Sequence, residues 1–547
     1  MSEISTQVLI VGAGPVGLAL AFELSSRGVH SIIIEQKIRA GAQPRAKTTN
    51  VRTMAHFRRW GLADAVRAAS PIDADFPRRI IFATRLFGHK LACFPDAFFG
   101  DQHAHDDRFP EPAQWIPQYT IEAVLRKALE GRAESTTRFG HTLVGLRQNA
   151  DGVDADVLHN GERQVIRARY VVGADGGRSS VRKAIGATME GDYAYMRNFL
   201  AVYRAPGLGD RVPLGQAISY WLVNPESPAV TGPMDKGDIW FFSTQLKNDE
   251  PVYDLPEARR RIKLAIGEDV PFDILETDTW SAHRLLADRY RDGRIFLAGD
   301  ACHLHPPMGG YGMNMGVGDA ADLGWKLAAV VQGWGGDRLL DSYEAERRPV
   351  ARLVIDEAAK NYGFVTHHMV RDQIEAGGVA GQSARETLGD AILAGKQREF
   401  RAIGVVLGLS YAGSPVVISD GTEILPWEPM NFKPDAQPGR LAPHCWLADG
   451  RSLYDVFGQG FTLIATTTQG VTSAAPLLAE AKRRGIPMLL ADLTGEPGVN
   501  SLYGANLALI RPDQHVAWRG NIIDPSPQEL LDRVSGLRTL ASQEAAG

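Results

Sequence analysis

The chain has 547 residues, which corresponds to roughly three or four domains of about 150 residues each. Hydrophobic residues make up 44% and charged residues 22%, a balance that excludes a disordered or collagen-like chain. The formal net charge of −5 predicts no nucleic-acid partner and no binding to an anionic membrane surface. Glycine is in clear excess, with 57 copies against a usual share of about 7%.

The sequence carries no signal for export or for a membrane. Residues 1–7 are polar, no basic region precedes an apolar core, and no run of about 18 apolar residues occurs. Cys93, Cys302 and Cys445 lie far apart and form no Cys-x-x-Cys pair, which favours reduced thiols. We therefore expect a cytoplasmic protein without a transmembrane helix or a disulfide framework.

A first glycine cluster follows a short β-branched run at residues 8–11, which is typical of a buried parallel strand. An apolar helical pattern continues to residue 28, and a second strand at 31–34 ends in an acid. This order of strand, G-x-G-x-x-G turn, helix, strand and acid is typical of a dinucleotide-binding unit. The residues predicted to contact the cofactor here are Gly12, Gly14, Pro15, Val16, Gly17, Glu35 and Gln36.

Each part of this unit has a physical role. Gly12 allows a tight turn, Gly14 lets the backbone approach a pyrophosphate, and Gly17 lets the helix pack closely on the strand. Glu35 is placed to accept a ribose hydroxyl, and the helix N-terminus offers free N–H groups. The motif alone does not separate FAD from NAD(P), and a glycine-rich turn without a ligand is the alternative interpretation.

A second glycine cluster lies within residues 170–182. A valine-rich strand leads into Asp175, a pair of glycines and the beginning of a helix. Two arginines, Arg178 and Arg182, follow the acid. The pattern therefore predicts another strand-to-helix junction, with charged groups close to the turn.

A third cluster fills residues 294–314. An apolar strand ends in Gly299 and Asp300, and a loop rich in proline and glycine follows, whose glycines let backbone N–H groups approach a flat ring. The apolar pattern then predicts a helix over 319–332 with Asp319 as its N-cap.

The three clusters resemble the three sequence signatures of group A flavin monooxygenases, the single-component aromatic hydroxylases related to p-hydroxybenzoate hydroxylase and phenol hydroxylase. They are similar to the family's ADP-ribose fingerprint, its D-G motif and its G-D motif, in which Cys302 replaces the usual alanine. The resemblance implies FAD as cofactor, with NADH or NADPH as co-substrate. It assigns further cofactor contacts to Asp175, Gly299, Asp300, Gly309, Gly312, Met313 and Asn314 and, in two other segments, to Arg45 and Gln118.

Within these assignments, the resemblance implies that Asp300 binds the ribityl chain. It also implies that the backbone N–H groups of Met313 and Asn314 face the pyrimidine edge of the flavin. Such donors would stabilise negative charge on the reduced ring.

The resemblance covers nearly the whole chain and implies its architecture. It predicts an α/β protein (α+β overall), in which a Rossmann-like FAD-binding domain carries an inserted antiparallel substrate-binding sheet and a C-terminal thioredoxin-like domain. Short β-rich pieces between Pro, Gly and Asp turns support the inserted sheet. The expected domains are 1–75, 110–185 and 285–400 for FAD with a helical extension, 76–109 and 186–284 for substrate, and 425–547 for the thioredoxin-like unit. Because Cys445 is the only cysteine of that last unit, a thiol–disulfide role is not expected.

The resemblance also implies a reaction, in which a phenolic or other aromatic substrate is hydroxylated with NAD(P)H and O₂ through a flavin hydroperoxide. The site then needs a dry pocket and a route for the phenolic proton. The catalytic candidates are Lys47, Tyr220, His283 and Pro307, and the pocket candidates are Trp221, Trp240 and Phe242. The alternatives are that Lys47 points to solvent and that half of the aromatic residues fill the core of the sheet.

Two other functions stay open at this point. One is different flavin chemistry on the same fold, such as a dehydrogenase or an epoxidase, and the other is a non-catalytic flavoprotein that binds an aromatic ligand. The arginine pair of the second motif favours docking of NAD(P)H over a simple binder. No metal is expected, because the histidines at 303, 305, 367 and 368 lack partners at ligand spacing. We expect a homodimer or a monomer, with a small aromatic substrate that the sequence does not identify.

Overall fold

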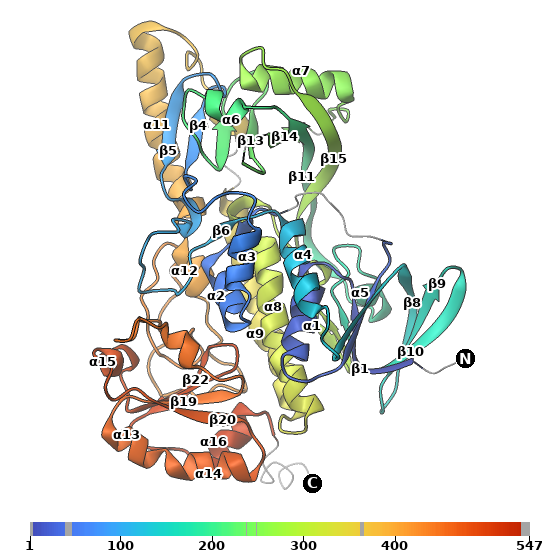
Figure 1. Cartoon of the computed structure of the whole chain (residues 1–547), viewed down its shortest axis with the longest axis vertical. Coiled ribbons are helices and arrows are strands. Elements are labelled where there is room, and N and C mark those ends of the chain that lie inside the picture. Colours follow the sequence, from blue (N-terminus) through green and yellow to red (C-terminus); the bar gives the residue numbers. More distant parts are fainter. Residues whose placement is uncertain (1–3, 39–45, 237, 248, 362–365, 538–547) are drawn as a thin grey trace.

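The computed structural model describes residues 4–38, 46–236, 238–247, 249–361 and 366–537 (Figure 1). Its first sheet, the FAD-domain sheet, runs in the order β16-β17-β10-β1-β2-β7, with β8 and β9 extending it beside β10. The bounds of its strands are β1 Ile4–Val11, β2 Ser31–Glu35, β7 Ser135–Phe139, β8 His141–Gln148, β9 Val153–His159, β10 Glu162–Gly173, β16 Arg291–Asp292 and β17 Ile295–Leu297.

The centre of the FAD-domain sheet is parallel. β1 pairs with β2 on one side and with β10 on the other, and β10 pairs with β17. These strands are buried apolar runs, as parallel strands covered on both faces must be. Since the carboxyl ends of parallel strands meet at one edge, the three glycine clusters that follow β1, β10 and β17 meet there as well.

Two helices that follow glycine clusters pack against each other, namely α1 (Pro15–Ser25) and α8 (Tyr311–Val331). The helix expected at 319–332 therefore begins at Tyr311, and Asp319 is a fully buried residue inside it rather than an N-cap. Gly316, one of the glycines that suggested a loop, lies inside this helix where the packing is close. A Cβ atom on Gly316 would lie 2.4 Å from the Val16 side chain on α1.

The second sheet, called the substrate sheet here, runs in the order β18-β15-β11-β14-β13-β12-β4-β5 and lies at the top of Figure 1. It is antiparallel except for the parallel pair β12 and β4. Helix α7 (Leu255–Ile266) covers one face, which we call the outer face. The bounds of the strands are β4 Ile80–Ala83, β5 Lys90–Phe94, β11 Met189–Arg204, β12 Ser219–Leu222, β13 Ala229–Pro233, β14 Ile239–Leu246, β15 Asp273–Ala287 and β18 His303–Leu304.

The C-terminal unit forms a third sheet with the order β20-β19-β21-β22, and it lies beside the lower ends of α8 and α9 in Figure 1. β19 is parallel to β20 and antiparallel to β21. We call this unit the C-terminal module. Its elements are β19 Phe461–Ala465, α13 Thr468–Ser473, α14 Ala475–Arg483, β20 Met488–Asp492, α15 Val499–Tyr503, β21 Leu507–Ile510, β22 Val516–Gly520 and α16 Pro527–Val534.

Helices connect and support these sheets. The helical extension expected within 285–400 contains the long α9, and α11 rises from the FAD domain along the substrate sheet (Figure 1). The remaining elements are α2 Val51–Arg59, α3 Ala63–Ala69, α4 Gln118–Leu129, α5 Ser180–Ala184, α6 Leu208–Arg211, α9 Asp337–Lys360, α10 Thr366–Met369, α11 Gly378–Phe400, α12 Ile403–Leu407 and the short pair β3 Thr48–Thr49 and β6 Gln114–Trp115. None of the helices described here is long and apolar enough to cross a membrane. The predicted fold class, an α/β protein with several sheets, is confirmed.

Candidate flavin and substrate site

The turn after β1 has the geometry that a pyrophosphate requires. Gly12 has a φ of +109°, and a Cβ atom there would lie 2.3 Å from the carbonyl oxygen of Ala174. A Cβ atom on Gly17 would lie 2.0 Å from the Gly12 oxygen, so both positions need glycine for packing. Gly14 differs, because nothing lies within 4 Å of its virtual Cβ. Open space in front of the N-terminus of α1 fits an anion held by helix N–H groups.

Glu35 stands at the end of β2, beside this turn. One carboxylate oxygen accepts from the backbone N–H of Ala13 at 3.0 Å, and the other accepts from Lys37 N at 2.9 Å. The carboxylate is therefore fixed next to the glycine turn, where the sequence predicts contact with a ribose. Gln36 is exposed, and Arg45 lies outside the described residues.

The third motif forms a tight loop that ends at the N-terminus of α8. Gly299, Gly309 and Gly310 have φ values of +61°, +80° and +65°, which favour glycine. The first N–H groups of α8 have no partner inside the helix, as at any helix N-terminus, and nothing lies within 4 Å of a Cβ on Gly312. These groups fit the flavin ring that the sequence predicts here, and Asp300, three residues after the end of β17, is exposed.

Asn314 fastens this helix start to the segment that precedes α2. Its Oδ1 atom accepts from Asn50 N at 2.9 Å, and its Nδ2 atom donates to Thr48 O at 2.9 Å and to Gly310 O at 2.7 Å. Gly310 O is the carbonyl to which a regular helix would pair Asn314 N–H. The side chain therefore ties the Gly310 N-cap of α8 to the segment before α2, and Met313 beside it is buried.

The second motif is mainly a structural junction. Asp175 accepts from Ser180 N at 2.6 Å and from Val181 N at 3.2 Å, so its carboxylate holds the start of α5. Arg182 is buried and donates to Gly177 O at 2.8 Å and to Ala301 O at 2.9 Å. This arginine therefore ties the second motif to the third, while Arg178 is exposed. Arg182 is thus engaged in holding the two motifs together, and docking of NAD(P)H by the arginine pair stays a prediction.

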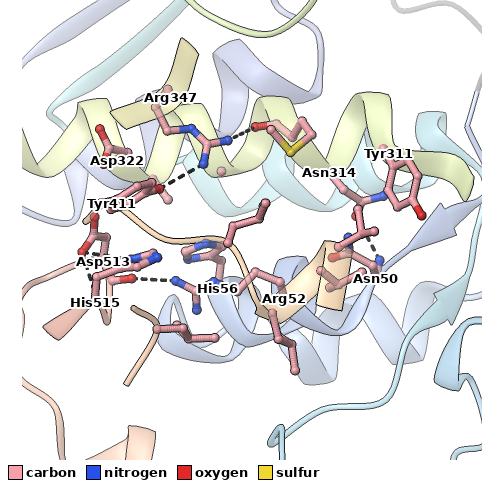
Figure 2. Close-up of a pocket in the computed structure, with 18 residues that line it drawn as sticks. Asn50, Arg52, His56, Tyr311, Asn314, Asp322, Arg347, Tyr411, Asp513 and His515 are labelled. Atoms are coloured by element: carbon pink, nitrogen blue, oxygen red, sulfur yellow. Dashed lines mark hydrogen bonds and ion pairs between the residues drawn. The ribbon is translucent and has the colours of Figure 1, made fainter. Parts of the chain in front are cut away.

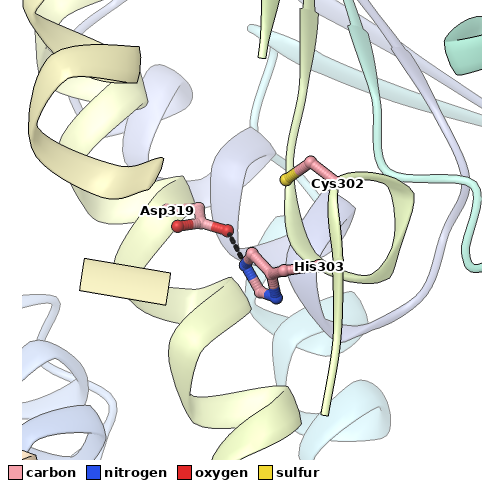
Figure 3. A group of neighbouring side chains, drawn as sticks. All are labelled: Cys302, His303 and Asp319. Carbon is pink, nitrogen blue, oxygen red and sulfur yellow. Dashed lines mark hydrogen bonds and ion pairs between the residues drawn. The ribbon is translucent and has the colours of Figure 1, made fainter. Parts of the chain in front are cut away.

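Two residues of the third motif, Cys302 and His303, form a buried polar cluster with Asp319 of α8 (Figure 3). Their potential ligand atoms all lie within 4.8 Å of one another. Burial raises the pKa of the Cys302 thiol well above its usual range, so it is protonated and donates to Gly299 O at 3.3 Å. Asp319 pairs with His303 Nε2 at 2.6 Å and accepts from Gly299 N at 2.9 Å. The donor set therefore fits support of the loop better than it fits a metal, which prefers a thiolate.

The two faces of the substrate sheet differ in environment. Tyr220, Trp240 and Phe242 point to the outer face and are packed in the core beneath α7. Because side chains alternate along a strand, Trp221 and Phe241 point to the opposite face. We call that opposite face the inner face. At its β11–β15 end Trp280 and Ala282 pack against Met308 of the flavin loop, so the inner face is turned toward the flavin site.

This geometry corrects three of the expected site residues. Trp240 and Phe242 are buried beneath α7 and do not line a pocket toward the flavin loop. Tyr220 is also buried there, and its hydroxyl donates to Gly215 O at 2.7 Å, which is a structural bond. Burial raises the pKa of Tyr220 well above its usual value, which further opposes a role as a base. Trp221 is on the inner face and remains a pocket candidate.

Lys47 reaches from the FAD domain to the inner face. Its Nζ atom lies 3.2 Å from the centroid of the Phe241 ring. Its backbone is fixed, since Lys47 O accepts from Ile116 N at 2.7 Å and Ala46 O accepts from Gln118 N at 2.8 Å. Burial lowers the pKa of Lys47 to about 7. No carboxylate among the described residues pairs with it, so the amine is present in both protonation states near neutral pH.

The other expected residues are less suitably placed for catalysis. His283 is on β15 next to Ala282, and its side chain therefore points away from the face that meets Met308. Its Nδ1 atom accepts from Ala194 N at 3.0 Å. The Pro307 ring is exposed, and its carbonyl accepts from Gly310 N at 3.1 Å in the flavin loop. Gln118, which the resemblance assigns to the cofactor and not to catalysis, donates its side-chain amide to Glu122 at 2.9 Å, and its cofactor contact stays a prediction.

Sequence reasoning missed several inner-face residues. Asn198 is 6% exposed, and its Nδ2 atom has no hydrogen-bond partner among the described residues. It pairs across the sheet with Trp280, which packs near Met308. Lys396 of α11 lies 4.1 Å from the Trp221 ring centroid. Strand alternation between Trp240 and Phe242 was the available signal for Phe241, and nothing in the sequence marked Asn198.

Taken together, the turn after β1, Glu35 and the start of α8 have the geometry expected of a flavin dinucleotide site, and the inner face of the substrate sheet lies beside them. Comparison with known proteins agrees with this class. Residues 5–358 match the family model of a FAD binding domain, and residues 435–537 match the model of an aromatic-ring hydroxylase C-terminal domain. The chain therefore belongs to the FAD-dependent aromatic-ring hydroxylases, as the sequence resemblance predicts.

Individual relatives align over nearly the full length. The chain is 32% identical to the FAD-dependent monooxygenase apdD of Emericella nidulans, over 96% of this chain and 89% of that protein. It is 32% identical to the tetracenomycin B2 monooxygenase-dioxygenase of Streptomyces olivaceus, over 98% of both chains. The crystal structure of an aklavinone-11 hydroxylase with FAD and aklavinone superposes with a TM-score of 0.83, at 29% identity, over 98% of this chain and 100% of that chain. The protein is a FAD-dependent monooxygenase.

Proposed function

We propose that the protein hydroxylates a phenolic aromatic substrate bound between the flavin loop and the inner face of the substrate sheet, with Lys47 handling the phenolic proton. NADH or NADPH serves as the reductant and O₂ as the oxidant. The observation that carries the proposal is the position of the Lys47 amine, which lies over the Phe241 ring on the inner face and has a pKa of about 7.

The FAD site is built from residues that fit the cofactor. The turn at Gly12–Gly17 and Glu35 would hold the ADP part, and the N-terminus of α8 with Asn314 would hold the ring end. Bound FAD, once reduced, supplies the activated oxygen for ring hydroxylation. The protein's part is to bind the aromatic substrate, keep water away from it and control its proton.

Lys47 can do this because both of its protonation states are accessible. A phenol has a pKa of about 10, and a nearby amine in its neutral form can accept the phenolic proton. The ammonium that results then pairs with the phenolate, which is the electron-rich form that attacks an oxygen electrophile. The low polarity that lowers the lysine pKa also strengthens this ion pair.

The inner face supplies the rest of a binding site. Trp221, Val230 and Ser243 are half-buried, whereas the outer-face residues between them are fully buried. A flat aromatic ring fits against such a partly open apolar wall. Asn198 adds an unpaired amide N–H, which can donate to an oxygen substituent of the substrate.

A comparison of three variants tests the role of Lys47. In Lys47→Met both the base and the charge are lost, and in Lys47→Arg the charge stays but the proton cannot leave. We expect both variants to bind FAD and to lose hydroxylation of a panel of phenols, by about 100-fold. Lys90→Met serves as the control, because Lys90 is an exposed residue on β5. Full hydroxylation by Lys47→Arg would show that the charge alone matters, and full hydroxylation by Lys47→Met would contradict the proposal.

A non-catalytic binding protein would behave differently. Such a protein would bind FAD and a phenol without any increase in NAD(P)H oxidation and without an oxygen atom in the product. Product analysis with ¹⁸O₂ separates the two functions, since a hydroxylase places one labelled oxygen atom on the aromatic ring.

A further inference from the structure

A loop of the C-terminal module is buried inside the FAD domain. This loop, Arg511–His515, connects β21 with β22, and all five of its residues are buried. It carries three ionisable side chains, which is unusual for a buried loop. Burial of charged groups is costly unless they are paired, so their partners indicate what the loop does.

Arg511 joins the two long helices of the FAD domain. It donates to both carboxylate oxygens of Glu346 on α9, at 2.6 and 2.8 Å, and to Asp322 on α8 at 3.1 Å. Burial opposes ionisation of Glu346, but Arg511 and Lys326 hold its pKa well below the usual range. Burial raises the pKa of Asp322 well above its usual range, and without the module Glu346 would keep only Lys326 as an ion-pair partner among the described residues.

The neighbouring residues continue this contact toward the flavin loop. The His515 ring stacks on Tyr411, with the ring centroids 4.2 Å apart, and the Tyr411 hydroxyl accepts from Arg347 at 3.0 Å (Figure 2). Arg347 donates to Asp319 at 2.7 Å, and Asp319 in turn accepts from Gly299 N at 2.9 Å. A continuous series of contacts therefore leads from the module to the G-D motif.

Asp319 carries a negative charge in this series of contacts. Burial opposes the ionisation of Asp319, yet His303 and Arg347 lower its pKa to about 2. Arg347 also donates to Met315 O at 3.0 Å, in the second turn of α8. A cavity of about 50 Å³ borders the network and is lined by residues from both of its ends, including Asn314 near the flavin loop and His515 in the module (Figure 2).

We propose that the C-terminal module is a positioning element of the flavin site. Its Arg511–His515 loop holds Tyr411 and Arg347 in place, and Arg347 fixes Asp319, which holds the backbone of Gly299 and the His303 ring. The module thereby sets the position of the G-D loop and of the first turns of α8, where the flavin binds. Tyr411 is the positioning residue that links the two domains.

The test compares two tyrosine-to-phenylalanine variants. Tyr411→Phe removes the hydroxyl that accepts from Arg347, and Tyr454→Phe is the matched control. The Tyr454 hydroxyl is also buried in a hydrogen bond, to Ala442 O at 2.6 Å, but it lies outside the series of contacts. The full-length apoprotein of each variant is titrated with FAD, and the visible absorption spectrum of the bound flavin is recorded at saturating FAD.

We expect Tyr411→Phe to raise the dissociation constant of FAD about five- to tenfold and to shift the flavin spectrum, because it leaves a buried guanidinium N–H without a partner. Tyr454→Phe should change the dissociation constant less than about twofold, although both variants lose similar thermal stability. Equal effects of the two variants on FAD, or no effect of Tyr411→Phe, would overturn the proposal.

A double-mutant cycle tests independently whether Tyr411 acts on FAD binding through Arg347 and Asp319. Tyr411→Phe and Asp319→Asn each break the same series of hydrogen bonds through Arg347. If Tyr411 acts on FAD affinity through that series, the effects of the two changes are less than additive. Additive effects would mean that Tyr411 acts on overall stability rather than on the flavin loop. Binding is the readout in each case, so the outcome does not depend on the aromatic substrate.

Discussion

The two faces of the substrate sheet carry similar amino acids but differ in what covers them. The outer face places Tyr220, Trp240 and Phe242 beneath α7, where each is at most 1% exposed. The inner face alternates with it and carries Trp221 and Phe241, with half-buried positions between them. The difference shows that α7 turns the outer face into core, while the inner face, where α11 packs against Trp221 through Lys396 and Phe400, keeps half-buried positions such as Val230 and Ser243.

The largest expected effect concerns stability on the outer face. Trp240→Ala should lower the free energy of unfolding by about 3–5 kcal/mol, since it opens a cavity beneath α7. Trp221→Ala on the inner face should cost less stability and should instead raise KM for the substrate. Chemical denaturation and steady-state kinetics of both variants check the contrast, and equal losses of stability would remove the distinction between the faces.

The next effect concerns pH. The hydroxylation rate should rise as the pH increases through about 7, where Lys47 loses its proton, and Lys47→Arg should lack this step.

The free energy of unfolding should also depend on pH through Lys47. The pKa of Lys47 is 10.5 in the unfolded chain and about 7 in the folded protein, so between these values only the unfolded state holds the proton. The wild type should therefore gain stability relative to Lys47→Met as the pH rises from 7 to 10.5.

Two asparagines give a smaller and sharper contrast. Asn198→Ala should raise KM by about tenfold if its free N–H binds the substrate, with little loss of stability because no internal bond is broken. Asn224 is the control, since its Nδ2 atom donates to Thr84 O at 3.0 Å and its Oδ1 atom accepts from Ser227 N at 2.7 Å. Asn224→Ala should lose stability and keep KM. Thermal melts and steady-state kinetics of both variants check this contrast. If Asn198→Ala lost stability and kept KM, the substrate would not bind at Asn198.

The smallest expected effect belongs to Tyr220→Phe. Loss of the hydroxyl bond to Gly215 O should lower the free energy of unfolding by about 1 kcal/mol. The rate of hydroxylation should stay the same, because the hydroxyl is on the outer face. A measured fall in kcat, with the fraction of folded protein unchanged, would return Tyr220 to the catalytic site.

Much of the flavin site was predictable from the sequence, because its motifs are local. The turn at Gly12–Gly17 needs glycine at fixed offsets between a strand and a helix, and that requirement is visible in a short window. Glu35 follows the next strand at a fixed distance for the same reason. The start of α8 was placed too late, since the packing of Gly316 against Val16 depends on a helix almost 300 residues away in sequence.

The substrate wall was predictable only in part. Both faces of the sheet are apolar, so the period of two in a strand does not reveal which set of side chains points inward. Trp221 and Trp240 look equivalent in sequence, and the positions of α11 and α7 on opposite faces separate them. Asn198 and the partners of Lys47 depend likewise on contacts between distant segments.

The sequence by itself determined the dinucleotide-binding turns, because close approach of backbone to phosphate and ring restricts a few positions to glycine. The resemblance of its three motifs to a known family indicated FAD and the family. Tertiary structure alone decided which face of the substrate sheet meets the flavin loop, and it set the environment of Lys47, whose pKa depends on burial beside Phe241. It also decided that the Arg511–His515 loop lies inside the FAD domain. These features rest on burial and on pairing between residues far apart in the chain, which no local pattern specifies.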